Sequence, residues 1–207
     1  MTNNYKHNIE RVYASAPESI RRAGTTWYKD AHATAKAWAA RYDLPLPAVC
    51  GCISALSPGM AWELNMELAE QFCKLAGTGK ARRITLEIPE SAFKRGYRRN
   101  ARKAWHIITG KLDPHAAFAT GTAQKTKAFF LNILNPVRSR EVTVDRHAYC
   151  LAIGLRASYG ARVSKRDYAT IERCYQSVAD RYNVAPHVVQ AVTWVWHRNR
   201  YQDSLFH

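Results

Sequence analysis

The chain has 207 residues, enough for one compact domain or for two closely packed lobes that share a core. Hydrophobic residues make up 47% of it, and 31 lysines and arginines face only 16 aspartates and glutamates, which gives a net charge of +15. Such an excess favours binding to a polyanion, because neutralising phosphates releases counterions. The sequence has no run of about 18 apolar residues and no charged, then apolar N-terminal leader, so we expect a cytoplasmic protein that neither spans a membrane nor is secreted.

The five cysteines lie within apolar patterns at helical spacing. Their odd number and their surroundings indicate buried thiols in a reducing compartment. Cys50-Gly51-Cys52 has no second ligand pair at the spacing of a metal site, so we expect no metal and no cofactor.

The hydrophobic pattern of the first half predicts three helical segments. Apolar residues recur at helical spacing from Trp27 to Tyr42, and Pro45 and Pro47 stop that segment. A short apolar segment covers Ala48 to Leu56, and a second stripe runs from Trp62 to Ala76.

Residues 77–98 interrupt this pattern, since they are rich in glycine, lysine and arginine and their apolar stretch Leu86–Pro89 is too short to predict a strand. Beyond them, helices are expected at about 99–110, 125–134, 146–154, 167–182 and 187–198. The predicted fold class is therefore all-α, a compact helical bundle.

A lysine-bearing turn and an aspartate flank the predicted helix 125–134. The turn reads Gly121-Thr122-Ala123-Gln124-Lys125-Thr126-Lys127, and the later segment reads Val142-Thr143-Val144-Asp145-Arg146-His147-Ala148. An ordinary helix start with lysines in solvent is one interpretation of the turn. A helix N-cap is one interpretation of Asp145.

The order of these segments resembles the catalytic core of the helix-hairpin-helix DNA glycosylases, which include endonuclease III and 8-oxoguanine DNA glycosylase. The resemblance implies a single domain over residues 1–207, with the hairpin and catalytic segment at about 121–154 and a DNA and base cleft between its two lobes. It also implies a turn that holds a phosphate through backbone N–H groups, helped by Thr122 and Gln124. Ala123 stands where relatives commonly have glycine.

In those glycosylases the corresponding aspartate caps a helix and also faces the nucleotide sugar, where its charge stabilises an oxocarbenium-like centre. The resemblance therefore implies that Asp145 is catalytic, with Arg146 beside it at the DNA. Bifunctional members attack the sugar with a hairpin lysine, a place that Lys125 or Lys127 would take here. The register stays open, as does the choice between a nucleophile and a phosphate contact, and we expect a monofunctional enzyme that activates water.

A second stretch, Cys52-Ile53-Ser54-Ala55-Leu56-Ser57-Pro58 followed by Trp62 and Asn65, resembles an early helix of the family that ends in Leu-Leu-Ser-Ala-Gln. In those relatives the residue after Ser-Ala enters the space left by the flipped nucleotide. The resemblance gives that place to Leu56, with Ser57 beside it. An apolar side chain inserted there partly unstacks a base step. A core leucine before a proline stop is the alternative.

A pocket for a flipped base needs an aromatic surface and a few polar edges, for which Trp62, Asn65, Trp27 and His32 are candidates. The resemblance does not reach Trp27 and His32, where core packing is the alternative. The densest positive cluster contains Arg95, Arg98, Arg99 and Arg102. These arginines share one side of a helix and suit a phosphate backbone, with a solvated helix face as the alternative.

These features together predict a monomeric DNA glycosylase that flips out and excises a modified base from double-stranded DNA. The segments around Leu56 and Asp145 also resemble glycosylase-like proteins associated with bacteriophage DNA. That resemblance implies a bulky pyrimidine such as glucosylated hydroxymethylcytosine as target, in attack on or defence against a phage. Two alternatives stay open: a glycosylase-derived enzyme that synthesises a hypermodified thymine, and a non-catalytic helix-hairpin-helix DNA-binding module.

Overall fold

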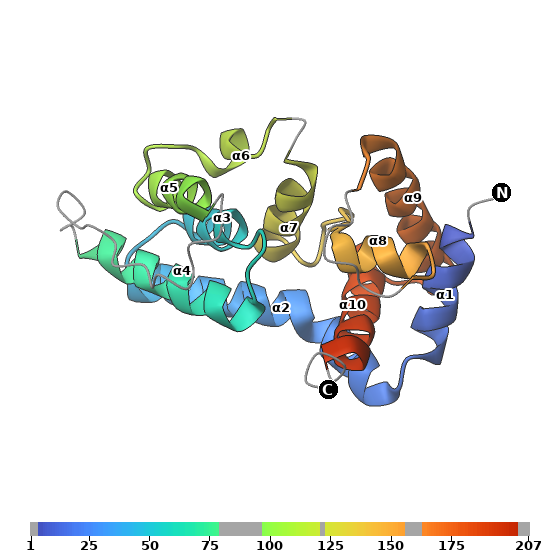
Figure 1. The fold of residues 1–207 in the computed structure, drawn as a ribbon. Helices are drawn as coiled ribbons and strands as arrows, with labels where there is room; N and C mark the ends of the chain where they lie inside the picture. Colours follow the sequence, from blue (N-terminus) through green and yellow to red (C-terminus); the bar gives the residue numbers. More distant parts are fainter. Residues whose placement is uncertain (1–3, 79–96, 121–122, 156–162, 203–207) are drawn as a thin grey trace. The chain divides into compact units, whose positions relative to one another are not determined.

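The computed structural model describes residues 4–78, 97–120, 123–155 and 163–202. These ranges contain ten helices and no strand, so the predicted all-α class is confirmed for them (Figure 1). The helices form two compact units: unit 1 comprises Met1–Asp30 and Asn135–His207, and unit 2 comprises Ala31–Leu134. Within the described ranges, no helix has the length and apolar character needed to cross a bilayer.

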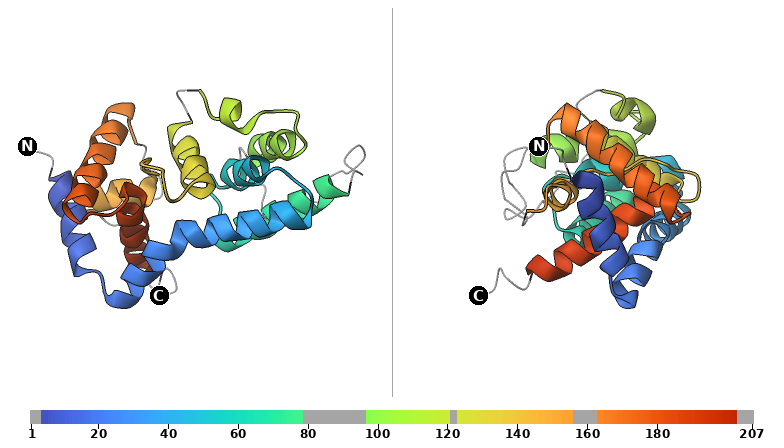
Figure 2. Two further views of the ribbon diagram at one scale, coloured as in Figure 1. Left: turned by 180° about the vertical axis from the view of Figure 1, so that it is seen from behind. Right: turned by 90° about the vertical axis from the view of Figure 1, so that its right-hand side faces the viewer.

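Unit 1 is built from segments at both ends of the chain. It contains α1 (Tyr5–Ser15), the first part of α2 (Glu18–Arg41), α8 (Arg146–Ala152), α9 (Lys165–Arg181) and α10 (Pro186–Gln202). The first helix packs against α8, α9 and α10, and Figure 2 shows α1 beside α9 in both views. The chain must therefore return to its N-terminal helix to complete this core.

The apolar stripe of α9 lies in that core as its spacing predicts. Tyr168, Ile171, Tyr175 and Val178 are all buried, whereas Tyr182, just beyond the helix, remains 37% exposed. Three or four residues separate successive members of the stripe, so they share one face of the helix.

Unit 2 is organised around α3 (Leu46–Leu56), whose residues from Ala48 to Leu56 are all buried. It packs against α4 (Trp62–Gly77), α5 (Tyr97–Ile108), α6 (Pro114–Ala117) and α7 (Gln124–Leu134). Gly51 allows this close packing, because a Cβ atom there would lie 2.9 Å from Ile107 Cγ2 and 3.1 Å from Pro114 Cβ.

Four of the five cysteines are buried as the sequence predicts. Cys50, Cys52, Cys73 and Cys150 are buried and Cys174 is half-buried, all as free thiols. Burial raises the pKa of Cys50 and of Cys73 to about 12, so these thiols stay protonated and act as small apolar side chains.

Candidate nucleic-acid site

Asp145 lies at the N-terminus of α8 in unit 1. Its backbone is extended (φ −91°, ψ −174°), and its Oδ1 accepts a hydrogen bond of 2.9 Å from Ala148 N. The predicted N-cap is therefore confirmed. The side chain is half-buried, and Oδ1 is the carboxylate oxygen that holds the helix.

The segment before Asp145 is fixed by the core of unit 1. Val142 and Val144 are buried, and Tyr168 binds the backbone of both. The Tyr168 hydroxyl donates to Val142 O at 2.8 Å and accepts from Val144 N at 3.4 Å. A side chain from α9 therefore sets the path of the chain into α8 and limits the movement of the carboxylate.

Two histidines lie near Asp145: His147, which belongs to the segment quoted from the sequence but was not among the predicted site residues, and His197, which the sequence did not indicate. His147 Nδ1 is 3.2 Å from His197 Nδ1, a contact that needs one donor and one acceptor and hence at least one neutral ring. Burial lowers the pKa of His197 to about 4, with a further lowering by His147 that Asp145 partly opposes. His197 is therefore neutral at neutral pH.

Indole rings and guanidinium groups extend this cluster. Trp194, half-buried on α10, makes edge contacts with Trp27 and His147 at centroid distances of 5.8 Å and 6.3 Å. The Arg198 guanidinium lies 5.2 Å from the Trp194 ring centroid, and Arg146 Nε lies 3.4 Å from His147 Nε2. Aromatic surfaces beside positive charge suit a nucleotide, whose base stacks and whose phosphate is anionic.

The lysine turn belongs to unit 2, at the start of α7. Gln124 and Lys127 are exposed and Lys125 is half-buried, all in the first turn of the helix. Thr122, predicted to hold a phosphate, lies outside the described residues, so the hairpin itself stays a prediction. The structure places these lysines and Asp145 in different units.

Within unit 2, the two stretches that carry the glycosylase resemblance contact each other. Ser54 Oγ donates a hydrogen bond of 2.6 Å to Thr126 O, and Trp62 makes an edge contact with Phe129 at 6.2 Å between ring centroids. Ser57 Oγ donates to Ser54 O at 2.9 Å, at the end of α3. The end of α3 thus anchors the first turn of α7, which bears the lysines.

Leu56 and Asn65, predicted to lie at the flipped base, are both inside unit 2. Leu56 is 0% exposed, which fits the core-packing alternative, and a wedge role would require its exposure. Asn65 is 1% exposed; its Nδ2 donates to Ile53 O at 3.2 Å, and among the described residues its Oδ1 has no hydrogen-bond partner. Neither side chain presents a surface to DNA in this structure.

Trp27 and His32, both on α2, lie in unit 1 and unit 2 respectively. His32 Nδ1 lies 2.9 Å from Ile133 O, so this ring is held by the backbone of α7. Trp27 instead contacts Tyr28 at 4.8 Å between ring centroids, in addition to Trp194. Of the two, only Trp27 joins the cluster near Asp145.

The basic face predicted on α5 is exposed in the structure. Arg98, Arg99 and Arg102 are exposed. The opposite side of the helix is buried and consists of Ala101, Ala104, Ile107 and Ile108. Arg95, which the sequence places in the same cluster, lies outside the described residues.

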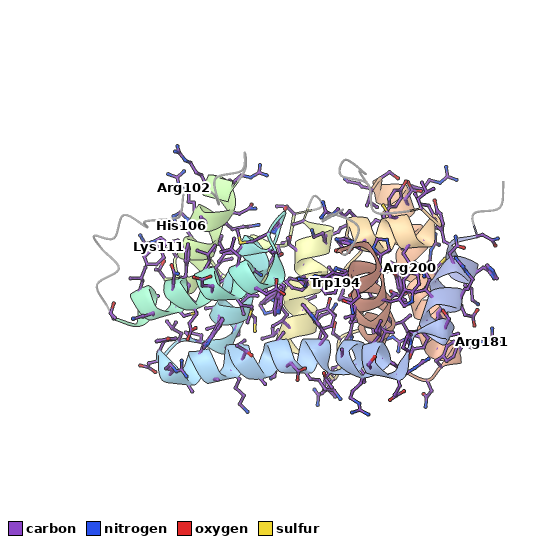
Figure 3. The ribbon with its side chains drawn as sticks, turned by 60° about the horizontal axis from the view of Figure 1, so that its bottom comes forward. Arg102, His106, Lys111, Arg181, Trp194 and Arg200 are labelled. Carbon is purple, nitrogen blue, oxygen red and sulfur yellow. The ribbon has the colours of Figure 1, made fainter. Side chains whose placement is uncertain are left out.

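Further basic side chains lie beside these arginines. Figure 3 shows Arg102, His106 and Lys111 following one another along α5 and the turn after it. Lys103 Nζ lies 4.7 Å from the centroid of the Phe118 ring. The pKa of Lys103 is lowered mainly by burial and to a smaller extent by the positive charge of Arg99. His106 lies four residues after Arg102 on α5, a helical spacing that could have indicated it from the sequence, whereas Lys111 lies in the turn beyond the helix.

The chain belongs to a family of unknown function, DUF7178, which matches residues 1–201. Neither the curated proteins nor the solved structures contain a match to it. The matched residues include helices of both units.

Proposed function

We propose that this protein is a DNA glycosylase that excises a modified base from double-stranded DNA, with Asp145 as the catalytic carboxylate. The observation that carries the proposal is the way Asp145 is held. One carboxylate oxygen caps α8, while the half-buried group lies in the part of unit 1 that also contains His147 and Trp194. A carboxylate fixed in advance stabilises positive charge on the sugar without reorganising as the base departs.

Positive charge supports the binding half of the proposal. The chain has a net charge of +15, and α5 carries exposed Arg98, Arg99 and Arg102 on one side. In the proposal these arginines contact phosphates, as do Lys125 and Lys127 at the start of α7. Such contacts position the duplex and do not themselves read its sequence.

The proposed target is a modified base, and a bulky pyrimidine such as glucosylated hydroxymethylcytosine in phage DNA is the specific candidate. This part of the proposal is supported by the resemblance of the segments around Leu56 and Asp145 to phage-associated glycosylase-like proteins. The enzyme would leave an abasic site in an intact strand, through attack by an activated water.

Base release from matched duplexes tests the proposal. Duplexes with one glucosylated hydroxymethylcytosine, one hydroxymethylcytosine or only plain bases are incubated with the full chain, and alkali-labile sites are quantified. We expect release from modified DNA, and a loss on the order of 100-fold or more in Asp145→Asn with DNA binding retained. An active Asn variant, or no release from any duplex, would contradict the proposal.

Asp113 provides the matched control for that substitution. Its Oδ1 accepts a hydrogen bond of 2.8 Å from Ala116 N at the start of α6, the same capping geometry as at Asp145. Asparagine caps helices about as well as aspartate, so Asp113→Asn should leave base release unchanged.

The cap itself also favours a second candidate, a non-catalytic DNA-binding module, because capping alone is enough to explain an aspartate at this position. That alternative predicts binding to duplex DNA with no base released from it. A hypermodifying enzyme would instead increase the mass of a base that stays attached to its sugar, which mass spectrometry of the digested nucleosides detects.

A further inference from the structure

Two tryptophan–arginine pairs lie on α10, each with the arginine four residues after the tryptophan. The Arg198 guanidinium lies 5.2 Å from the Trp194 ring centroid, and that of Arg200 lies 5.1 Å from the Trp196 centroid. The two pairs therefore have nearly the same distance between the guanidinium and the ring. Figure 3 shows Trp194 and Arg200 on different sides of the helix, so the pairs face different surroundings.

The two tryptophans differ in what they contact. Trp196 packs against the hydrophobic core of unit 1, which accounts for its presence. Trp194 instead makes T-shaped contacts with the rings of Trp27 and His147. Because His147 is in the first turn of α8, Trp194 lies at the end of that helix which Asp145 caps.

We propose that Trp194 is a stacking platform for a nucleobase turned out of the DNA stack, an inference that rests on the proposed function. The ligand class is an unpaired nucleotide of any base type, because every base has a π-face and stacking does not require a particular hydrogen-bond pattern. A platform that tolerates different bases suits a modified target, whose added group projects from the ring edge.

A base that stacks on Trp194 has to replace the Arg198 guanidinium, which lies over the ring. A stacked base contributes more than an exposed cation–π contact does, so the base displaces the guanidinium from the Trp194 face. The arginine then pairs with the phosphate flanking the extruded nucleotide, where a guanidinium forms two parallel hydrogen bonds. Arg146, which contacts His147, adds positive charge on the same side.

A fluorescent base analogue tests the platform in the full chain. The probes are a duplex with one 2-aminopurine in a single-nucleotide bulge and a duplex in which the same 2-aminopurine is paired. The readouts are the ratio of the two affinities and the quenching of the bulged base, which stacking on an indole produces. A ratio measured on one sample cancels any fraction of protein that has lost its fold.

We expect the wild-type protein to prefer and quench the bulged probe, and Trp194→Leu to reduce that preference by roughly 5- to 100-fold. Trp194→Phe should retain much of the preference, because it keeps an aromatic face. Trp196→Leu is the matched control and should leave the ratio unchanged. Circular dichroism melts establish that each variant is folded.

Failure of the platform is distinct from failure of the proposed function. A wild-type protein without preference for the bulge overturns the platform, and so does a Trp194→Leu variant that keeps the preference. If the protein releases a base but shows either of these two binding results, the platform is wrong and the glycosylase proposal is still supported. Conversely, a preference that Trp194→Leu removes, in a protein that releases no base, supports the platform and contradicts the glycosylase.

Discussion

Asp145 has a structural role that has to be separated from any chemical one. Removing its capping oxygen in Asp145→Ala should lower the free energy of unfolding by about 0.5–2 kcal/mol, because Ala148 N loses its acceptor. Asp145→Asn should stay close to wild type in urea denaturation. A similar loss is expected for Ser164→Ala, since Ser164 Oγ accepts from Asp167 N at 3.1 Å to cap α9. If Asp145→Asn unfolds as readily as Asp145→Ala, its activity no longer reports on chemistry.

The low pKa of His197 predicts a loss of stability in weak acid. The pKa is about 4 in the folded protein against an ordinary value of 6.5, so between these pH values the unfolded chain binds a proton that the fold excludes. The contribution is complete above pH 6.5 and is lost as the pH falls toward 4. The free energy of unfolding should decrease by up to about 1.4 kcal/mol per pH unit in this window.

Denaturant titrations from pH 7.5 to pH 4 measure that slope. His197→Gln should flatten it, because glutamine binds no proton in this range. His7→Gln, which removes an exposed histidine of α1, should leave the slope unchanged. An equal slope in wild type and His197→Gln would mean that this histidine does not carry the acid sensitivity.

At the level of helices, the exposed face of α5 makes a prediction about salt. Replacing Arg98, Arg99 and Arg102 together by alanine should reduce the slope of log affinity for DNA against log salt by about 1 to 3, because each lost phosphate contact removes nearly one released counterion. The control is a second triple on α9, where three exposed cations are replaced: Lys165, Arg166 and Arg173. If both triple-alanine variants reduced the salt slope equally, the slope would reflect the net charge of the protein and not contacts made by α5.

The first turn of α7 carries a prediction about mechanism. Because we propose that water attacks the sugar, borohydride should trap no covalent protein–DNA adduct during base release, and the strand should stay intact until alkali is added. Lys125→Ala and Lys127→Ala should weaken DNA binding without abolishing base release. Trapping in wild type that disappears in either variant would establish a lysine nucleophile and identify which lysine it is.

Helical periodicity predicted most elements of this fold, with ends that differ from the structure by a few residues except at α2, which begins at Glu18 and not near Trp27. Two helices were missed. For α1, the signal was present in the spacing of Tyr5, Ile9 and Val12, all of which are buried. The four-residue α6 is too short for any periodicity, although its Asp113-Pro114 start is typical of a helix N-terminus.

The candidate site was only partly predictable. The N-cap at Asp145 could be read from local sequence, because capping involves neighbours three residues apart. The contact between His147 and His197 could not, since it joins residues 50 positions apart through the packing of α8 on α10. The burial of Leu56 depends likewise on the helices around α3, which a single sequence does not reveal.

For the whole molecule, the chain order has a consequence that local patterns do not show. Unit 2 is continuous in sequence, whereas unit 1 combines the first residues with the last third of the chain. The core of unit 1 therefore depends on α1, whose Ile9 is fully buried among residues of α8, α9 and α10. The two cores should respond separately to damage, because proteins open in cooperative units that follow such packing.

Matched core substitutions test this division. Ile9→Ala in α1 and Ile53→Ala in α3 each remove the same atoms from a fully buried side chain, at a cost of about 2–5 kcal/mol. In hydrogen exchange, Ile9→Ala should lower the protection of amides in α8, α9 and α10, far away in sequence, and spare those of α3. Ile53→Ala should show the reverse pattern. If either substitution lowered protection equally in both units, the chain would unfold as one cooperative body, and its two cores could not be weakened independently.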